Sequence, residues 1–152
     1  MIFPERKNKI HISSPEYGNI EISRDMVINF KYGVNGSSGP GGFVVLGLKR
    51  FAPFLVLVSE KKPHTAYPIL DPNTIIPGYS PEISGRELDL IGNPEKNSIQ
   101  VVTFIELDKK KKSAFFDLRH PILINVKQKL GKQVEINNYP ERFEIPGHLL
   151  RQ

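Results

Sequence analysis

Residues 99–137 restrict the possible folds more than any other stretch of the chain. They comprise two apolar runs separated by four lysines, followed by a third run in which apolar and polar residues alternate. β-Forming residues occupy every second position from Ile99 to Leu107, and Val102 and Phe104 between them are apolar as well. A strand that is apolar on both faces belongs in a closed or doubly covered sheet. We therefore predict a meander of β-strands that forms the wall of the core.

The second half of this stretch repeats the alternation. Apolar residues recur at every second position over residues 122–126, after Pro121, and again at Val134 and Ile136. Leu130-Gly131 lies between these two segments, and a glycine between alternating segments favours a turn. The sequence therefore predicts two further strands joined by a turn at residues 130–131.

The remainder of the chain also contains short alternating segments bounded by turn residues. Residues 10–12 and 20–22 predict a hairpin. Further strands are predicted over residues 26–30, 43–48, 54–59 and 66–70. Pro68 lies inside the last of these and has no backbone N–H, which implies an edge position or an irregular pairing.

One helix is predicted near residues 84–91. Ser84 is a suitable N-cap, and Glu87 stands three residues later, where it completes a capping box. Gly92 and Pro94 end the segment. A helix this short is marginal alone and must dock on the strands. The fold class predicted from the residues is therefore all-β with one short helix.

The size and composition of the chain predict a single domain. With 152 residues it can bury about two thirds of its extended surface around one core. It has no cysteine, so it offers neither a disulfide framework nor a thiolate metal site. No apolar run approaches the roughly 18 residues that span a membrane, and no apolar leader follows the charged residues near Met1. We expect one domain over residues 1–152, flexible at residues 1–8 and 141–152, in the cytoplasm.

The chain carries a modest positive charge that is concentrated in one place. Its net charge is +5, and four lysines are contiguous: Lys109, Lys110, Lys111 and Lys112. One interpretation is a solvated hairpin tip that keeps two apolar strands apart from other chains. The other is an electrostatic contact with phosphate or with an acidic partner.

Residues 36–42 hold four glycines, two serines and a proline, which predicts an irregular loop. A phosphate-binding loop would need a Lys and a Ser or Thr directly after its last glycine, at the start of a helix. Here Gly42 is followed by Phe43-Val44-Val45, a strand pattern. The glycines therefore do not indicate a nucleotide site.

No catalytic or metal-binding pattern emerges from the sequence. The four histidines, His11, His64, His120 and His148, lie at no spacing that would bring two imidazoles to one metal. No serine lies in a G-x-S-x-G turn. Asp71, Asp108 and Asp117 could pair only through the fold, which the sequence does not give. We expect no catalytic residue, no metal and no cofactor.

Several short motifs, taken in order, resemble those of the flagellar assembly factor family FliW. They are Tyr17-Gly18-x-Ile20-Glu21-Ile22, Ile28-x-Phe30-x-x-Gly33, Pro53-Phe54-Leu55, Ala66-Tyr67-Pro68-Ile69-Leu70-Asp71-Pro72, Pro77-x-Tyr79, Ala114, Pro121-Ile122-x-Ile124-Asn125 and Gly131-Lys132-Gln133-Val134. Their order and spacing extend over about residues 10–140.

The resemblance implies a compact antiparallel β-barrel-like fold without enzymatic activity. It further implies a partner switch, in which the protein binds newly made flagellin in the cytoplasm and, once flagellin is exported, binds the RNA-binding translational regulator CsrA. The second binding event relieves repression of flagellin synthesis. Phe54, Asp71, Tyr79 and Asn125 match family motifs or lie beside turns, and they are the candidate partner contacts. We expect no direct nucleic-acid or membrane contact, and a monomer.

Two other function classes stay open. A small RNA-binding β-barrel would use the basic hairpin tip and stack bases on aromatic side chains, for which Phe104, Phe115 and Phe116 are the candidates. A small hydrolase would require a cleft with convergent titrating groups.

Overall fold

The computed structural model describes most of the chain. The described residues are 9–14, 18–34, 40–49, 52–62, 65–108 and 110–150. Residues 1–8, for which flexibility was expected, lie outside this set, as do Lys109, His64 and most of the predicted glycine loop.

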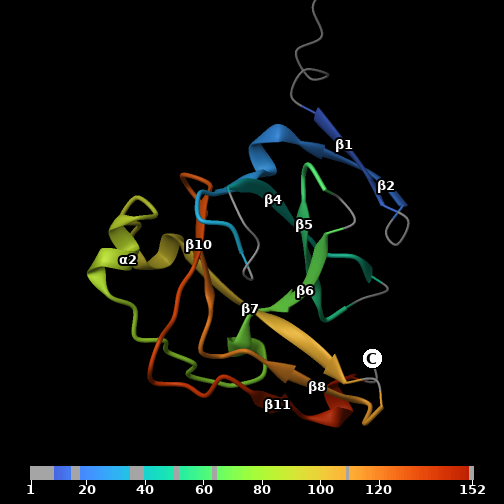
Figure 1. The fold of residues 1–152 in the computed structure, drawn as a ribbon, viewed down its shortest axis with the longest axis vertical. Coiled ribbons are helices and arrows are strands. Elements are labelled where there is room, and N and C mark those ends of the chain that lie inside the picture. The colour runs from blue at the N-terminus through green and yellow to red at the C-terminus, as the bar shows by residue number, and fades with distance from the viewer. Residues whose placement is uncertain are drawn as a thin grey trace, which may run out of the picture.

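Seven strands close into a barrel, and the predicted all-β fold is confirmed (Figure 1). In chain order they are β3 (Ile28–Phe30), β4 (Gly41–Leu46), β5 (Leu55–Ser59), β6 (Ala66–Leu70), β7 (Ile99–Asp108), β9 (Ile122–Asn125) and β10 (Leu130–Gln133). Closure comes from β7, which pairs with β9 from Ile99↔Asn125 to Val102↔Ile122. These pairings are antiparallel except that of β10 with β3, which is parallel at Leu130↔Asn29.

β7 belongs to two sheets because it is longer than its barrel neighbours. Its second half, from Ile105 to Asp108, pairs with β8 (Ser113–Phe116), and β8 pairs with β11 (Phe143–Ile145). Val102 faces the barrel core, whereas Ile105 packs in a second apolar cluster with Phe116. This explains why the sequence of β7 is apolar on both faces.

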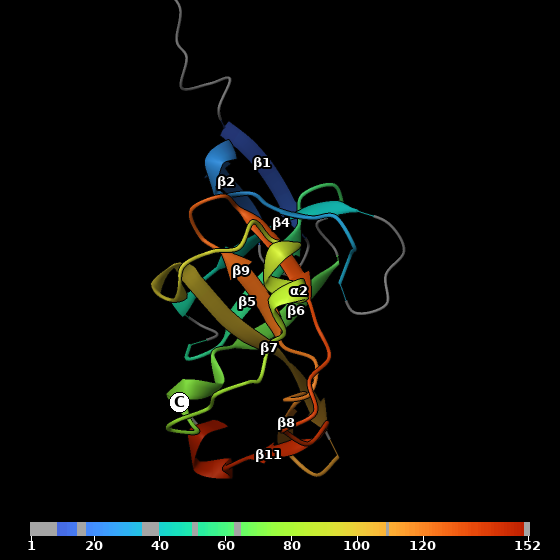
Figure 2. The same ribbon diagram turned by 90° about the vertical axis from the view of Figure 1, so that its left-hand side faces the viewer.

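The N-terminal hairpin lies at the opposite end of the molecule from β8 and β11 (Figure 2). It consists of β1 (Lys9–Ser14) and β2 (Gly18–Ser23), which pair with each other. Ile12 and Ile22 pack against Val44 and Val56 of the barrel strands in a separate apolar cluster. The short 3-10 turn η1 (Arg24–Met26) then leads into β3.

The predicted helix forms as α2 (Gly85–Asp89), shorter than the expected residues 84–91. The Ser84 hydroxyl accepts a hydrogen bond from the Glu87 amide at 3.3 Å, which confirms the N-cap. The Lys132 ammonium lies 2.8 Å from the Glu87 carboxylate and so ties α2 to β10. The remaining helical turns are η3 (Pro72–Thr74), η4 (Lys96–Ser98) and η5 (Gly147–Leu150). None of the helices in the described ranges is long and apolar enough to cross a membrane.

The turn predicted at Leu130-Gly131 is wrong. Both residues belong to β10, and the chain turns earlier, over residues 126–129, where Lys129 adopts a φ of 58°. Gly131 is buried against the Phe30 ring, and a Cβ there would collide with that ring. A close approach of backbone to an aromatic ring therefore explains the glycine, which the local pattern had indicated as a turn residue.

Three further expectations change in detail. Gly41 and Gly42 belong to β4, where they pair with Phe30 and Asn29, instead of to the predicted irregular loop. The strand requires a glycine at position 42, because a Cβ there would lie 2.7 Å from atoms of Val27 and Glu60. Val134 and Ile136 lie beyond β10, although their amides still donate to the carbonyls of Pro121 and Arg119. Residues 143–145 of the end that was expected to be flexible form β11.

The irregular pairing predicted at Pro68 is confirmed. β6 pairs with β5 along four positions, including Val56↔Pro68, but it pairs with β7 only at Ile69↔Phe104 and Leu70↔Thr103. Pro68 thus lies where β6 separates from β7, and its missing N–H leaves no ladder bond unmade.

A substitution at Gly131 tests the close packing against Phe30. We expect Gly131→Ala to lower the free energy of unfolding by about 2–3 kcal/mol, because the added methyl group overpacks a buried contact. Gly85→Ala is the matched control, since a Cβ there meets no atom within 4 Å. Urea denaturation followed by circular dichroism measures both variants, and equal stability of the two would contradict the packing account.

Candidate functional site

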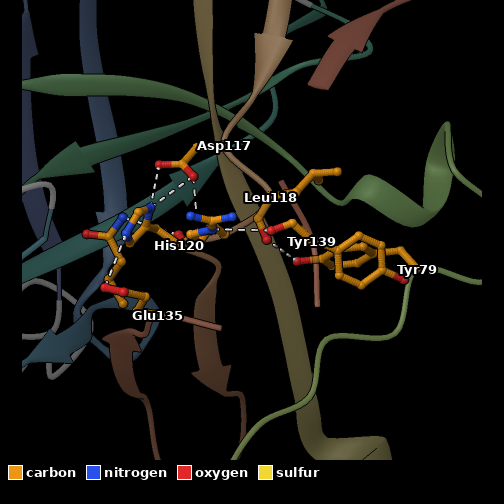
Figure 3. A network of polar contacts seen from close by, with 8 residues as sticks. Tyr79, Asp117, Leu118, His120, Glu135 and Tyr139 are labelled. Atoms are coloured by element: carbon orange, nitrogen blue, oxygen red, sulfur yellow. Dashed lines mark hydrogen bonds and ion pairs between the residues drawn. The ribbon is translucent and has the colours of Figure 1, made fainter. Parts of the chain in front are cut away.

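Tyr79 is held inside the molecule by its ring and by its hydroxyl. The side chain is 5% exposed, and the hydroxyl donates to the Leu118 carbonyl at 3.1 Å (Figure 3). The Tyr79 and Tyr139 ring centroids are 4.6 Å apart. The Tyr139 hydroxyl in turn accepts from the Ser80 amide at 2.9 Å. Two aromatic residues therefore fasten the loop before α2 to the segment that follows β10.

A second polar group fixes the crossing from β8 to β9. The Nδ1 atom of His120 lies 3.0 Å from both carboxylate oxygens of Asp117, and its Nε2 lies 3.8 Å from the Glu135 carboxylate (Figure 3). The His120 carbonyl accepts from the Gln133 side chain at 3.2 Å. His120 therefore has a structural role in joining this crossing to the strand end at Gln133.

Phe54 and Asp71 lie beside the cluster that contains Tyr79. Phe54 is half-buried and packs on that cluster, and Asp71 directly follows its member Leu70. One carboxylate oxygen of Asp71 accepts from the Asn73 amide at 2.9 Å, which caps η3. The fold thus brings three of the four candidate contacts, Phe54, Asp71 and Tyr79, to one region. Their role in partner binding stays a prediction.

Asn125 lies elsewhere, at the end of β9, and is 1% exposed. Its side-chain amide donates to the Ile91 carbonyl at 2.8 Å, and its Oδ1 accepts from the amides of Lys127 and Gln128, both at 3.1 Å. The side chain therefore holds the turn after β9 and the segment after α2 together. Partner contact by Asn125 also stays a prediction.

The lysine run occupies the turn between β7 and β8. Lys110, Lys111 and Lys112 are exposed, and Lys109 lies outside the described residues. The amides of Lys110 and Lys111 donate to one carboxylate oxygen of Asp108 at 3.1 and 3.2 Å. Asp108 therefore orders the backbone of this turn while three ammonium groups project from an exposed tip.

The structure contains a cleft that the sequence did not indicate. It measures about 470 Å³ and lies where β6 separates from β7. The residues that line it include Tyr67, Pro68, Phe104, Glu106, Asp117, Glu141 and Arg142. The Tyr67 and Phe104 rings meet edge to face with centroids 5.0 Å apart. The one sequence signal is Glu106, a charge at an otherwise apolar stretch of β7.

The polar side chains of this region hold neighbouring segments of the chain in place. Among the described residues, no group of three or more His, Asp or Glu side chains is placed to hold a metal ion. The polar groups around Tyr79, His120 and Asn125 form hydrogen bonds that connect loops. Hydrogen-bond networks of this kind rigidify a fold. The loops that they connect are therefore held in one arrangement.

Replacing Tyr79 tests the fastening of the loop before α2. Tyr79→Phe leaves the buried Leu118 carbonyl without its donor, so we expect the free energy of unfolding to fall by about 1–2 kcal/mol. Tyr32→Phe is the control, because Tyr32 is largely exposed. Urea denaturation should give the control a change within about 0.5 kcal/mol. A change for Tyr79→Phe that is as small as that of the control would show that the Tyr79 hydroxyl adds nothing to stability.

The same variant should lack a dependence of stability on pH that the wild type shows. Burial raises the pKa of the Tyr79 hydroxyl well above its ordinary value, and the nearby Tyr139 and Asp117 act in the same direction. The unfolded chain releases this proton near pH 10, whereas the folded protein retains it. The stabilisation is thus complete below pH 10 and is lost as the pH rises further, by up to about 1.4 kcal/mol per pH unit. Urea titrations at pH 9 and 11 should show this loss in the wild type relative to Tyr79→Phe; parallel behaviour would contradict it.

Comparison with known proteins agrees with the motifs and the fold. A family model described as "FliW protein" matches residues 11–145. A flagellar assembly factor FliW from Bacillus velezensis is 28% identical over 138 residues, which cover 90% of this chain and 96% of that protein. One from Thermosipho africanus is 30% identical over 133 residues, covering 87% and 90%.

A solved structure supports the same family. The crystal structure of a flagellar assembly factor FliW superposes with a TM-score of 0.79 and 25% sequence identity, and the match covers 90% of this chain and 97% of that one. The family match spans the barrel, the hairpin from His11 onward and β11. The chain belongs to the FliW family.

Proposed function

We propose that this protein is a non-enzymatic flagellar assembly factor that acts in the cytoplasm by binding two proteins in turn. One partner is flagellin, and the other is the RNA-binding translational regulator CsrA, whose capture relieves repression of flagellin synthesis. The observation that carries the proposal is the family match over residues 11–145, combined with relatives named as flagellar assembly factors.

A rigid barrel can act as a switch without any chemistry. Two partners that share one surface, or that couple to each other through the fold, compete according to their affinities and concentrations. A flagellin segment that is disordered before assembly would fold on binding, which lowers its affinity per unit of contact area. Flagellin would then occupy the protein when abundant, and its export would free the protein for the regulator.

The predicted contact residues have two roles in the proposed switch: some contact the partner, and others support the fold behind the contact. Phe54 and Asp71 are half-buried and present part of their surface to a partner. Tyr79 supports that surface from within through its bond to Leu118. Asn125, at the end of β9, supports the turn after that strand through its bond to Ile91. The lysine tip supplies electrostatic attraction, which acts chiefly on the rate of association.

The aromatic residues favour protein partners over RNA. Phe116 is buried, Phe104 packs against Tyr67, and the Arg142 guanidinium covers the Phe115 ring with its carbon 3.7 Å from the ring centroid. Binding of single strands needs aromatic faces on which bases can stack. Each of the three candidate phenylalanines is therefore buried or already in contact with another side chain.

Isothermal titration with purified partners tests the proposed switch. We expect the protein to bind nuclease-treated flagellin and nuclease-treated CsrA separately, and saturating flagellin to lower the apparent affinity for CsrA at least tenfold. Ovalbumin serves as a control for non-specific binding. The proposal is contradicted if the protein fails to bind flagellin or fails to bind CsrA. Binding that requires RNA to be present would favour the RNA-binding alternative.

Charge reversal tests the lysine tip. We expect Lys110→Glu combined with Lys111→Glu to slow association with at least one partner about threefold or more at low salt, and the difference to shrink as salt is raised. Lys96→Glu combined with Lys127→Glu changes the net charge equally at exposed positions elsewhere. Stopped-flow association rates provide the measurement. Equal rates for the two double variants would limit the lysine run to a role in solubility.

A further inference from the structure

We propose that the cleft beside β7 binds an extended peptide segment in which apolar and basic residues alternate. The inference rests on the proposed function for its biological partner, and it deepens that function by naming the site and the kind of segment that docks there. Three features of the cleft carry it: an incompletely paired strand, an aromatic floor and an excess of carboxylates.

The strand pairing points to an extended occupant. Beyond Phe104, β7 pairs with β8 on one side, from Ile105↔Phe116 to Asp108↔Ser113. On its other side, the pairing with β6 ends at Ile69↔Phe104. In the described part of the chain, no other strand takes the place of β6 there. A strand from a partner can add to such an edge through main-chain hydrogen bonds.

The floor of the cleft accommodates apolar side chains. Tyr67 and Phe104 are partly buried and pack against the core cluster of the barrel, so the cleft borders that core. Pro68 lines the β6 wall and has no amide to donate, which leaves β7 as the pairing partner for an incoming strand. In an extended segment every second side chain points to the same face, so alternate residues would reach the aromatic floor.

The charged side chains that line the cleft favour a docked segment with basic residues. Glu106, Asp117 and Glu141 line the cleft, against one guanidinium, that of Arg142. Arg142 is stacked on Phe115, and Asp117 is bonded to His120, whereas Glu106 and Glu141 are exposed. On a chain with a net charge of +5 this is a local reversal of sign, and it disfavours nucleic acid. Lysine or arginine side chains on the docked segment would complement it.

Fluorescence anisotropy with designed peptides tests the inference on the full chain. The probe is a labelled octapeptide in which valine and lysine alternate. One comparison peptide carries glutamate in place of lysine, and another carries N-methyl groups on alternate backbone amides. We expect the lysine peptide to bind at least tenfold more tightly than either. Equal binding of the lysine and glutamate peptides would overturn the charge argument, and tolerance of N-methylation would overturn strand addition.

Paired variants locate the site. Glu106→Gln with Glu141→Gln should weaken binding of the lysine peptide at least fivefold, because both carboxylates line the cleft. Glu82→Gln with Glu95→Gln removes the same charge from exposed positions outside the cleft and should change it less than twofold. An equal effect of the two pairs would overturn the assignment. The variant with Glu106→Gln and Glu141→Gln is called the cleft pair below. If the wild type self-associates in analytical ultracentrifugation and only the cleft pair does not, the occupant of the cleft is a second copy of this chain and not a peptide.

Full-length partners separate this inference from the proposed function. If the cleft pair binds flagellin and CsrA as the wild type does, the inference fails while the proposed function stands. If the wild type binds the lysine peptide but neither protein, the cleft is a peptide site and the proposed function fails. The inference predicts a fivefold or larger loss of affinity for one of the two proteins in the cleft pair.

Discussion

The antiparallel pairing of β7 with β9 is the interaction on which the rest of the fold depends. It closes the barrel from Ile99↔Asn125 to Val102↔Ile122, and without it the sheet would expose two unpaired edges. The same strand then continues past the barrel and carries β8 and β11. A single strand therefore positions both the closed core and the appended sheet, and the cleft lies where these two parts meet.

Buried polar side chains connect segments of the chain that strand pairing does not join. Asn125 bonds two amides in the turn after β9 and the Ile91 carbonyl after α2, and Tyr79 reaches the carbonyl of Leu118 between β8 and β9. An unpartnered polar group at these positions would cost about 1–3 kcal/mol, so each side chain specifies one local arrangement. Residues that match family motifs can thus reflect the demands of the fold as much as those of a partner.

Much of the architecture could be predicted because its signals are local. The alternation from Ile99 to Leu107 and the N-cap at Ser84 depend on neighbours in the sequence, and both are present in the structure. The role of Gly131 could not be predicted, because the Phe30 ring that excludes a side chain lies about one hundred positions away. The cleft was missed for the same reason: Phe104 looked like a core residue, and nothing local places it beside Tyr67 and Arg142.

The parallel junction between β3 and β10 has a consequence for synthesis on the ribosome. Asn29 meets Leu130 only after about one hundred intervening residues have been made, so loop closure here is entropically costly and late. A nascent chain that has emerged as far as β7 still has β3 and β7 as open strand edges. At about 5–20 residues per second, translation leaves those edges uncovered for a few seconds, the interval in which nascent copies on neighbouring ribosomes could join edge to edge.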